Sequence, residues 1–439
     1  MNDNQDHRLS LKVAAVMDFL PAVTQCVETA AVSFGLGVNE SLKLRLAAEE
    51  IFSYLCMRVC RGAPLEVLCV GCLSYVRIEF HFSVSTLDMG ALNMTTAVSL
   101  DGDDDISEMG LVIASRTVDR LYITTGIQNR VVLSMEEDKD YPKLADISLK
   151  SVDLHDVLTV VAPDTEDIKR FAMQMGICAH DPLRPSFFNY PGKVADMVAA
   201  DHCRALTARD DAGTIAGGIL YRTLTEKIIE VFKPCIFHPP REEEIASMLV
   251  EACISKTAKT KAVGLVNLTG LPASIQPQFE TLGSLTYHQE SGAPLVSPAF
   301  CRLLHEDPGC QVWTDPTLKD YLEQEYNRLF LARDIREVRN LGETQTGSSI
   351  FATELRRERS EAFLRPLWPG NDLTSNLKRH MELCKKESLL NIFFTVDMGI
   401  SWHASIIPIL MSQHFTPKVI IPFAGQADLV IFQYDESES

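Results

Sequence analysis

The stretch that most constrains the fold joins a strand-like run, residues 228–237, to a helix-like run, residues 245–257. The connection reads His-Pro-Pro-Arg-Glu-Glu-Glu, residues 238–244. The first amides of a helix lack intrahelical partners and lie at the positive end of its dipole, so such a turn is where α/β proteins bind phosphate. Three consecutive glutamates here repel an anion. The pattern therefore predicts an α/β protein whose phosphate-binding turn has lost its ligand.

The same stretch resembles the acyl-CoA loop of the GNAT acetyltransferases, which reads roughly H-P-x-x-R-G-x-G-I-G/A-x-x-L. Arg241, Ile245, Ala246 and Leu249 match this pattern, and glutamates 242 and 244 replace its two glycines. The resemblance implies acetyl-CoA as the cofactor, held around Arg241, Ile245 and Ala246. The glutamates block the close backbone approach that the pyrophosphate needs, so the cofactor loop is degraded.

The GNAT resemblance extends over residues 157–290. A catalytic base in this family often lies on the strand before the loop, where this chain has Glu230; the alternative is a charge that faces the sheet edge. The family's late helix, expected at residues 273–282, usually carries a tyrosine as general acid. Phe279 stands at that position and has no proton to donate. Pro277 would also kink the helix.

The first 130 residues or so resemble the anti-sigma-factor serine kinases, which have the GHKL ATP-binding fold. Leu-x-Leu-Ala-Ala-Glu-Glu, residues 44–50, and the stretch 109–120 carry this resemblance. It places Glu50 as the base that activates a hydroxyl. Tyr54 stands where the family's Mg²⁺-binding asparagine should be. Without that metal ligand, a solvated helix edge is the simpler interpretation of Glu50.

The remaining nucleotide-binding motifs are also incomplete. In the stretch 82–88, which aligns with the family's D-x-G-x-P-F-D motif, only Asp88 remains. The glycine-rich ATP lid is reduced to Gly110, preceded by an acidic run at 103–108. The resemblance thus makes ATP a possible cofactor, with Asp88 and Gly110 as its remaining contacts, but the site resembles a degraded one.

These patterns predict an α/β (α+β) protein in which a GHKL-type α/β sandwich precedes GNAT-like mixed-sheet domains. We place the first domain at 1–137, the GNAT-like domain at 156–290 and a second α/β domain, possibly GNAT-like, at 300–439. Helix 373–386, strand 389–396, helix 402–414 and strands 418–421 and 428–433 repeat the order of elements in the back half of the GNAT-like domain. This suggests an internal duplication.

Charge and cysteine usage exclude several functions. The chain carries 59 acidic and 41 basic residues, a net charge of −18, and no basic stripe, so binding to nucleic acid or anionic membrane is not expected. No signal peptide or membrane-length apolar run is recognisable, and 12 irregularly spaced cysteines are expected as reduced thiols in the cytoplasm. Zinc binding by Cys56, Cys60, Cys69 and Cys72 is the alternative to buried thiols, which we favour, so no metal is predicted.

The sequence therefore predicts a cytoplasmic regulatory protein that binds a protein partner or a small effector, with weakened or lost catalysis. Two alternatives remain open. One is an active GNAT N-acetyltransferase that holds acetyl-CoA through a shifted loop. The other is an ATP-binding serine kinase of a partner-switching pathway, in which Glu50 and Asp88 converge on a pocket.

Overall fold

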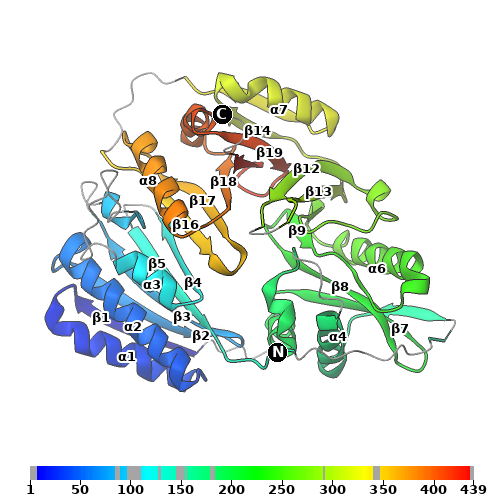
Figure 1. Cartoon of the computed structure of the whole chain (residues 1–439), viewed down its shortest axis with the longest axis horizontal. Helices are drawn as coiled ribbons and strands as arrows, with labels where there is room; N and C mark the ends of the chain where they lie inside the picture. The colour runs from blue at the N-terminus through cyan, green and yellow to red at the C-terminus, as the bar shows by residue number, and fades with distance from the viewer. Residues whose placement is uncertain are drawn as a thin grey trace.

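The chain has a mixed α/β fold, as the sequence predicts (Figure 1). The computed structural model describes residues 7–84, 89–95, 110–126, 130–144, 154–155, 157–177, 183–289, 292–339 and 347–435. Within these residues the strands form a five-stranded sheet, a thirteen-stranded sheet and a separate pair. No helix of the described ranges is long and apolar enough to cross a membrane.

The N-terminal region, residues 7–138, is an antiparallel sheet of order β1-β2-β3-β5-β4 whose helices pack on one face (Figure 1). Along β3 buried and partly buried residues alternate, because one face of the sheet is covered and the other is not. Its elements are β1 His7–Ala14, η1 Met17–Phe19, α1 Leu20–Ser33, α2 Val38–Tyr54, η2 Leu55–Val59, β2 Pro64–Gly71, β3 Tyr75–Ser83, η3 Met89–Leu92, α3 Gly110–Thr117, β4 Arg120–Thr125 and β5 Arg130–Asp138.

The large sheet has the order β16-β17-β18-β20-β19-β12-β13-β11-β9-β8-β7-β6, with β10 paired to β8. Strands from both sides of the predicted boundary at 290–300 join in it, and the division into two domains there stays a prediction. Its first part contains β6 Leu158–Val161, α4 Thr165–Ile177, η6 Ser186–Asn189, α5 Pro191–Ala199, β7 Arg204–Asp210, β8 Ile215–Thr223, β9 Ile228–Val231, β10 Cys235–Ile236, η7 Pro239–Arg241, α6 Glu242–Thr257, β11 Gly264–Asn267, η8 Gln276–Gln278, β12 Glu280–Tyr287 and β13 Leu295–Leu303.

The remaining elements complete this sheet and add a small parallel pair, β14 with β15. They are β14 Cys310–Thr314, α7 Pro316–Arg328, β15 Arg333–Glu337, β16 Ile350–Arg356, η9 Arg357–Arg359, β17 Glu361–Trp368, α8 Leu373–Lys386, β18 Asn391–Asp397, η10 Ser401–Ile406, α9 Ile407–Ser412, β19 Phe415–Ile421 and β20 Leu429–Tyr434. The sequence patterns did not predict β14 and β15.

The two halves of the large sheet repeat one pairing scheme. In the first half, residues 158–303, the strands β8-β9-β11-β13-β12 pair antiparallel, parallel, antiparallel and antiparallel. In the second half, residues 350–434, β16-β17-β18-β20-β19 pair in the same order. The parallel pair is bridged by α6 in one half and by α8 in the other. The repeated element order in the sequence thus corresponds to a structural repeat.

The halves meet where β12 pairs with β19, and the strands are in register only at Gly283 and Val419. Gly283 has φ +125°, and a Cβ at this position would lie 1.9 Å from the carbonyl oxygen of Lys418. Only glycine permits this approach. Beyond the contact, the side-chain amide of Gln433 pairs with the backbone of Thr286, donating to its carbonyl and accepting from its N–H at 3.0 Å.

One predicted element is wrong. The helix expected at 273–282 is a single 3-10 turn, η8, after which β12 begins at Glu280. Pro277 lies within that turn, where its missing N–H prevents a regular helix from continuing. Helix α7 ends at Arg328, and Phe330 beyond it has a left-handed backbone with φ +54°.

Candidate functional site

The turn before α6 is the candidate cofactor site, and its one arginine is already paired. The Nε of Arg241 lies 2.8 Å from Glu244 Oε2, and its Nη2 lies 2.7 Å from Oε1. Its Nη1 also donates to the carbonyl of His155 at 3.1 Å. Glu242, Glu243 and Glu244 form the first turn and are all exposed. The helix dipole is therefore complemented by three carboxylates of the chain itself, and a phosphate would meet net negative charge.

The two other predicted cofactor residues belong to the core. Ile245 and Ala246 are fully buried and pack with the apolar side chains of the first half. A Cβ added to Gly217, on β8, would lie 3.0 Å from Ile245 Cγ2, so the helix sits close to the sheet. The side chains of Ile245 and Ala246 position α6, and only their backbone amides could reach a ligand.

The predicted base, Glu230, does not face the sheet edge. It lies on β9 opposite Arg222 of β8, whose Nε donates to Glu230 Oε2 at 2.6 Å. The glutamate is buried, with 6% of its surface exposed, and the arginine also packs over the ring of Phe232. The buried carboxylate is therefore held in an ion pair with an arginine whose side chain is 42% exposed. A substrate proton would have to compete with Arg222 for this carboxylate.

Phe279, at the position of the family's general acid, is 8% exposed and packs in the same core as α6. It lies just after η8 and not on a helix. The site therefore lacks a proton donor at this position and presents apolar surface instead.

In the N-terminal region, the structure brings Glu50 close to Gly110. A Cβ on Gly110 would lie 3.4 Å from the carbonyl oxygen of Glu50 and 3.2 Å from Tyr54 Cβ. Tyr54 is buried, and its hydroxyl donates to the carbonyl of Ala91. It thus fills the space beside Gly110 instead of offering a metal ligand. Asp88 and the acidic run at 103–108 lie outside the described residues.

A buried amide network joins the N-terminal region to the second half of the large sheet. The sequence patterns did not predict it. Asn93 donates to the carbonyl of Ser349 at 2.7 Å and accepts from the N–H of Phe351 at 3.1 Å. Asn376, on α8, donates to Asn93 Oδ1 at 3.2 Å and to Ser349 Oγ at 2.9 Å. The signal was present: Asn376 is a polar residue within the apolar face of an expected helix.

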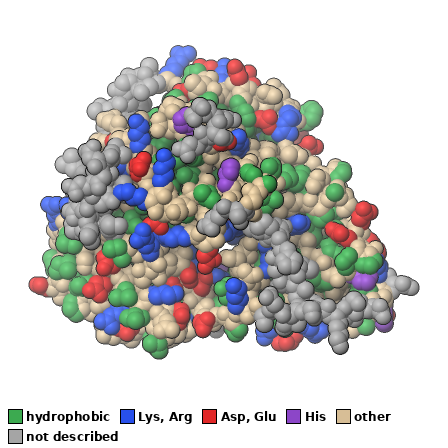
Figure 2. Space-filling view, viewed as in Figure 1, with side chains coloured by type: hydrophobic (Ala, Val, Ile, Leu, Met, Phe, Trp, Pro, Cys, Tyr) green, Lys and Arg blue, Asp and Glu red, His purple; other side chains and the backbone are tan. Residues whose placement is uncertain are grey.

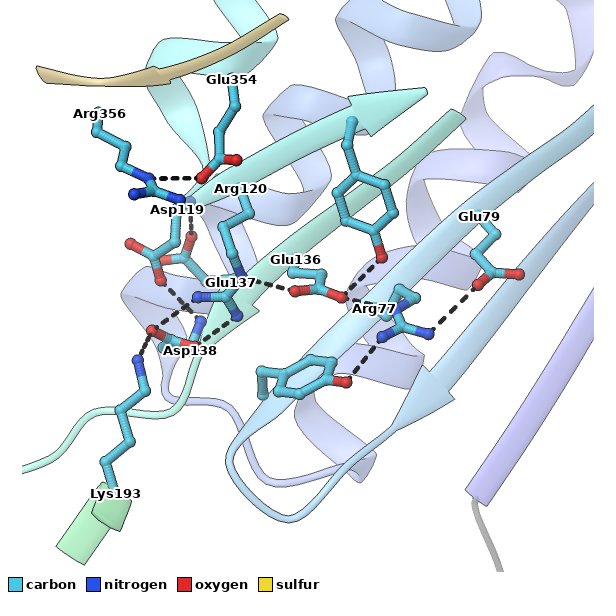
Figure 3. A network of polar contacts seen from close by, with 12 residues as sticks. Arg77, Glu79, Asp119, Arg120, Glu136, Glu137, Asp138, Lys193, Glu354 and Arg356 are labelled. Carbon is cyan, nitrogen blue, oxygen red and sulfur yellow. Dashed lines mark hydrogen bonds and ion pairs between the residues drawn. The ribbon is translucent and has the colours of Figure 1, made fainter. Parts of the chain in front are cut away.

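The N-terminal region contacts the first half through a chain of ion pairs (Figure 3). Arg77 and Arg120 lie 2.7 and 2.6 Å from the two oxygens of Glu136. Arg120 continues to Asp138 at 2.7 Å, and Asp138 pairs with Lys193 of α5. Burial opposes ionisation of Glu136, but the two guanidinium groups, Arg120 first, hold its pKa below the usual value. Lys193 therefore ties α5 to a charged and partly buried network.

Metal-ligating side chains gather at one place in the described part of the chain. Ligand atoms of His155, Asp210 and Asp211 all lie within 4.8 Å of one another. However, Asp210 already accepts the N–H groups of His155 and Thr214, so its carboxylate holds the turn between β7 and β8. Burial raises the pKa of the thiols of Cys56, to about 11, and of Cys60 and Cys69, to about 12, so they remain protonated.

No protein-family model matches the chain, and no curated protein is significantly similar to it in sequence. Solved acetyltransferases resemble it in fold over about a third of its length. An N-acetyltransferase from Staphylococcus aureus Mu50 is 15% identical, with a TM-score of 0.28, over 34% of this chain and 99% of its own. A GNAT phosphinothricin acetyltransferase from Sinorhizobium meliloti, solved with acetyl-CoA, is 15% identical with a TM-score of 0.28 over 34% and 89%. An aminoglycoside 6'-N-acetyltransferase from Enterococcus faecium is 10% identical with a TM-score of 0.28 over 34% and 99%.

Proposed function

We propose that this chain is a regulatory binding protein built on a GNAT-like scaffold that has lost acetyl transfer. The observation that carries the proposal is the α6 turn, where Arg241 is paired with Glu244 and three exposed carboxylates occupy the first turn. A pyrophosphate needs free backbone amides and a positive field, and this turn supplies neither. The ion pair of Glu230 and the apolar Phe279 support the same conclusion for the base and the acid.

An exposed apolar stripe on α2 supports binding of a protein partner. Val38, Leu42 and Leu46 follow one another at intervals of four residues and are 83%, 45% and 47% exposed. Met57, 51% exposed, lies within η2, which follows α2 directly. Figure 2 shows hydrophobic side chains among charged ones over α1 and α2, at the lower left of the view. Exposed apolar side chains that gather on one surface mark interaction sites.

The test is acetyl transfer by the full chain. The purified protein is incubated with acetyl-CoA and a panel of amines, and release of the CoA thiol is measured. We expect no release above the rate without protein. Release that is abolished by Glu230→Gln, and retained by the exposed control Glu251→Gln, would show that the chain is an active acetyltransferase instead.

The partner surface is tested separately. Leu42→Ser with Leu46→Ser should abolish association with a partner once it is identified, whereas the equally exposed Leu390→Ser should not. If the original chain, the double variant and the control all bind the partner equally, the partner surface lies elsewhere. Circular dichroism of each variant confirms that the N-terminal region is folded.

A further inference from the structure

A cavity of about 320 Å³ lies beside the join between the two halves of the large sheet. Its walls come from η8 and β12, from β13, from the segment that follows α7, and from Pro422, which follows β19. Its lining combines apolar side chains with three polar ones: Gln278, Glu280, Leu282, Cys301, Arg302, Leu303, Leu329, Phe330, Leu331 and Pro422. A mostly apolar cavity of this size with a few polar groups fits a small ligand.

Phe330 is the residue that most strongly indicates a ligand. Its side chain is 89% exposed, so it gains almost nothing from burial within the chain. Its backbone has φ +54° at the end of α7, where Leu331 N–H bonds to the carbonyl of Tyr326 at 2.9 Å. Helices that end in this way usually carry glycine at the left-handed position, because a side chain there is strained. The chain therefore keeps an exposed aromatic ring on a strained backbone position at the wall of the cavity.

Glu280 provides the second indication. It is exposed, and no hydrogen bond or ion pair within the described ranges occupies its carboxylate, although Arg328, which pairs with Glu325, lies close enough to interact with its charge. It lies opposite Cys301 in the β12–β13 pair, so both side chains are on the same face of the sheet. The neighbouring Arg302 is engaged, since its Nη1 donates to the backbone and side-chain oxygens of Gln278 at 3.2 and 3.3 Å.

We propose that this cavity binds an organic ammonium ion with an apolar body. The apolar body would contact the leucine side chains that line the cavity. The cation would lie between the face of Phe330 and the carboxylate of Glu280. An aromatic face and a carboxylate both attract a cation. At about 30 Å³ for a water-sized group, the cavity holds about ten non-hydrogen atoms.

The cavity is separate from the α6 turn. Cys301 and Leu282 belong to the core that packs against α7, whereas Phe279 and Phe300 belong to the core under α6. The sheet lies between them. The ligand site therefore goes beyond the proposed function, and either one can fail without the other.

The experiment measures binding of three size-matched probes to the full chain by calorimetry at pH 7. They are 2-phenylethylammonium, the neutral 2-phenylethanol and the anionic phenylacetate. We expect the ammonium to bind at least about tenfold more tightly than the other two. No binding of the ammonium at millimolar concentration, or equal binding of all three probes, would overturn the proposal.

Two variants locate the site. Phe330→Gly removes the ring and relieves the left-handed strain, so it should weaken ammonium binding about tenfold while the unfolding temperature stays the same or rises. Glu280→Gln should bring ammonium and alcohol to similar affinities. The control Phe19→Ala removes another exposed ring, 41% exposed and in the N-terminal region, and should leave binding unchanged. If both cavity variants bind like the original chain, the ligand site is elsewhere and the proposal is wrong.

Discussion

The two halves of the large sheet use one pairing scheme but treat the start of their bridging helices differently. In the first half, α6 begins in solvent with three exposed glutamates. In the second half, Asp372 precedes α8 and accepts from the N–H and hydroxyl of Ser349 at 2.5 and 2.7 Å. Asn93 of the N-terminal region completes the buried network there. The same strand–helix–strand unit thus serves as an exposed surface in one half and as a docking platform in the other.

The N-terminal region contacts the two halves through different chemistry. Its contact with the first half includes the ion pair of Asp138 with Lys193 and the stacked rings of Tyr75 and His202. Its contact with the second half combines a shared apolar core that includes Ile350 and Leu383, the buried amide network around Asn93, and the ion pair of Arg116 with Glu387. Charged contacts respond to pH and salt, whereas buried neutral hydrogen bonds do so far less. Perturbing each contact should therefore give a distinct signature.

The largest effect should come from breaking the join between the halves. Gly283→Ala adds a Cβ that would lie 1.9 Å from Lys418 O at a left-handed φ of +125°, so β12 must separate from β19. We expect a loss of about 3–5 kcal/mol in the free energy of unfolding, measured in urea. Gly213→Ala is the matched control, because Gly213 has φ +82° with open space around it and loses only the strain. Equal losses for both variants would show that the join is not tightly packed.

The buried amide contact should give the next largest effect. Asn93→Ala leaves the N–H of Phe351 buried without its acceptor and removes the donor to Ser349. The expected loss is about 2–3 kcal/mol, independent of salt concentration. Ser247→Ala, on the exposed face of α6, should cost less than about 0.5 kcal/mol. A small loss for Asn93→Ala would mean that the second half is not the docking platform.

At the contact between the N-terminal region and the first half, the free energy of unfolding should depend on pH through Glu137, the residue before Asp138. Burial raises the pKa of Glu137 to about 7, although Lys43 Nζ lies 2.6 Å from its carboxylate. The folded chain therefore holds this proton more tightly than the unfolded chain, whose usual pKa is 4.5. The stabilisation is complete below pH 4.5 and is lost as pH rises through 7, by about 3 kcal/mol.

Glu137→Gln should flatten this fall, as followed by urea unfolding at several pH values. Glu136 and Asp138 act in the opposite direction and at lower pH, because their pKa values lie below the usual ones. The exposed control Glu382→Gln should keep the original slope. An unchanged slope in Glu137→Gln would assign the pH dependence to another group.

The smallest effect is expected at the α6 turn itself. Glu244→Gln weakens an ion pair whose glutamate side chain is 51% exposed. Such pairs contribute little to stability, so the unfolding temperature should change by less than about 2 °C. A larger change in the unfolding temperature would show that the Arg241–Glu244 pair stabilises the fold.

The sequence predicted the elements whose pattern is local. The helix predicted at 373–386 and the strand predicted at 389–396 are confirmed as α8 Leu373–Lys386 and β18 Asn391–Asp397. The 273–282 helix was wrong because a proline overrides the neighbouring residues. The join at Gly283 and the network at Asn93 depend on residues that are far apart in the chain, so no local pattern contains them.

For the candidate site, the loss of acetyl-CoA binding at the α6 turn stays a prediction. The substitution of glycines by glutamates is visible in the residues alone. The pairing of Arg241 with Glu244 and of Glu230 with Arg222 required the structure, because each depends on side-chain geometry. The cavity beside Phe330 could not be predicted, since its walls come from four separate segments.

The most direct test of the central claim, that the α6 turn no longer holds acetyl-CoA, is a thermal-unfolding scan of the full chain with millimolar acetyl-CoA. Ligand at 100 times its dissociation constant adds about 2.7 kcal/mol to stability, which appears as a rise of a few degrees. The account predicts a change of less than about 1 °C. A saturable rise of several degrees, lost in a variant with Arg241→Ala, would contradict it.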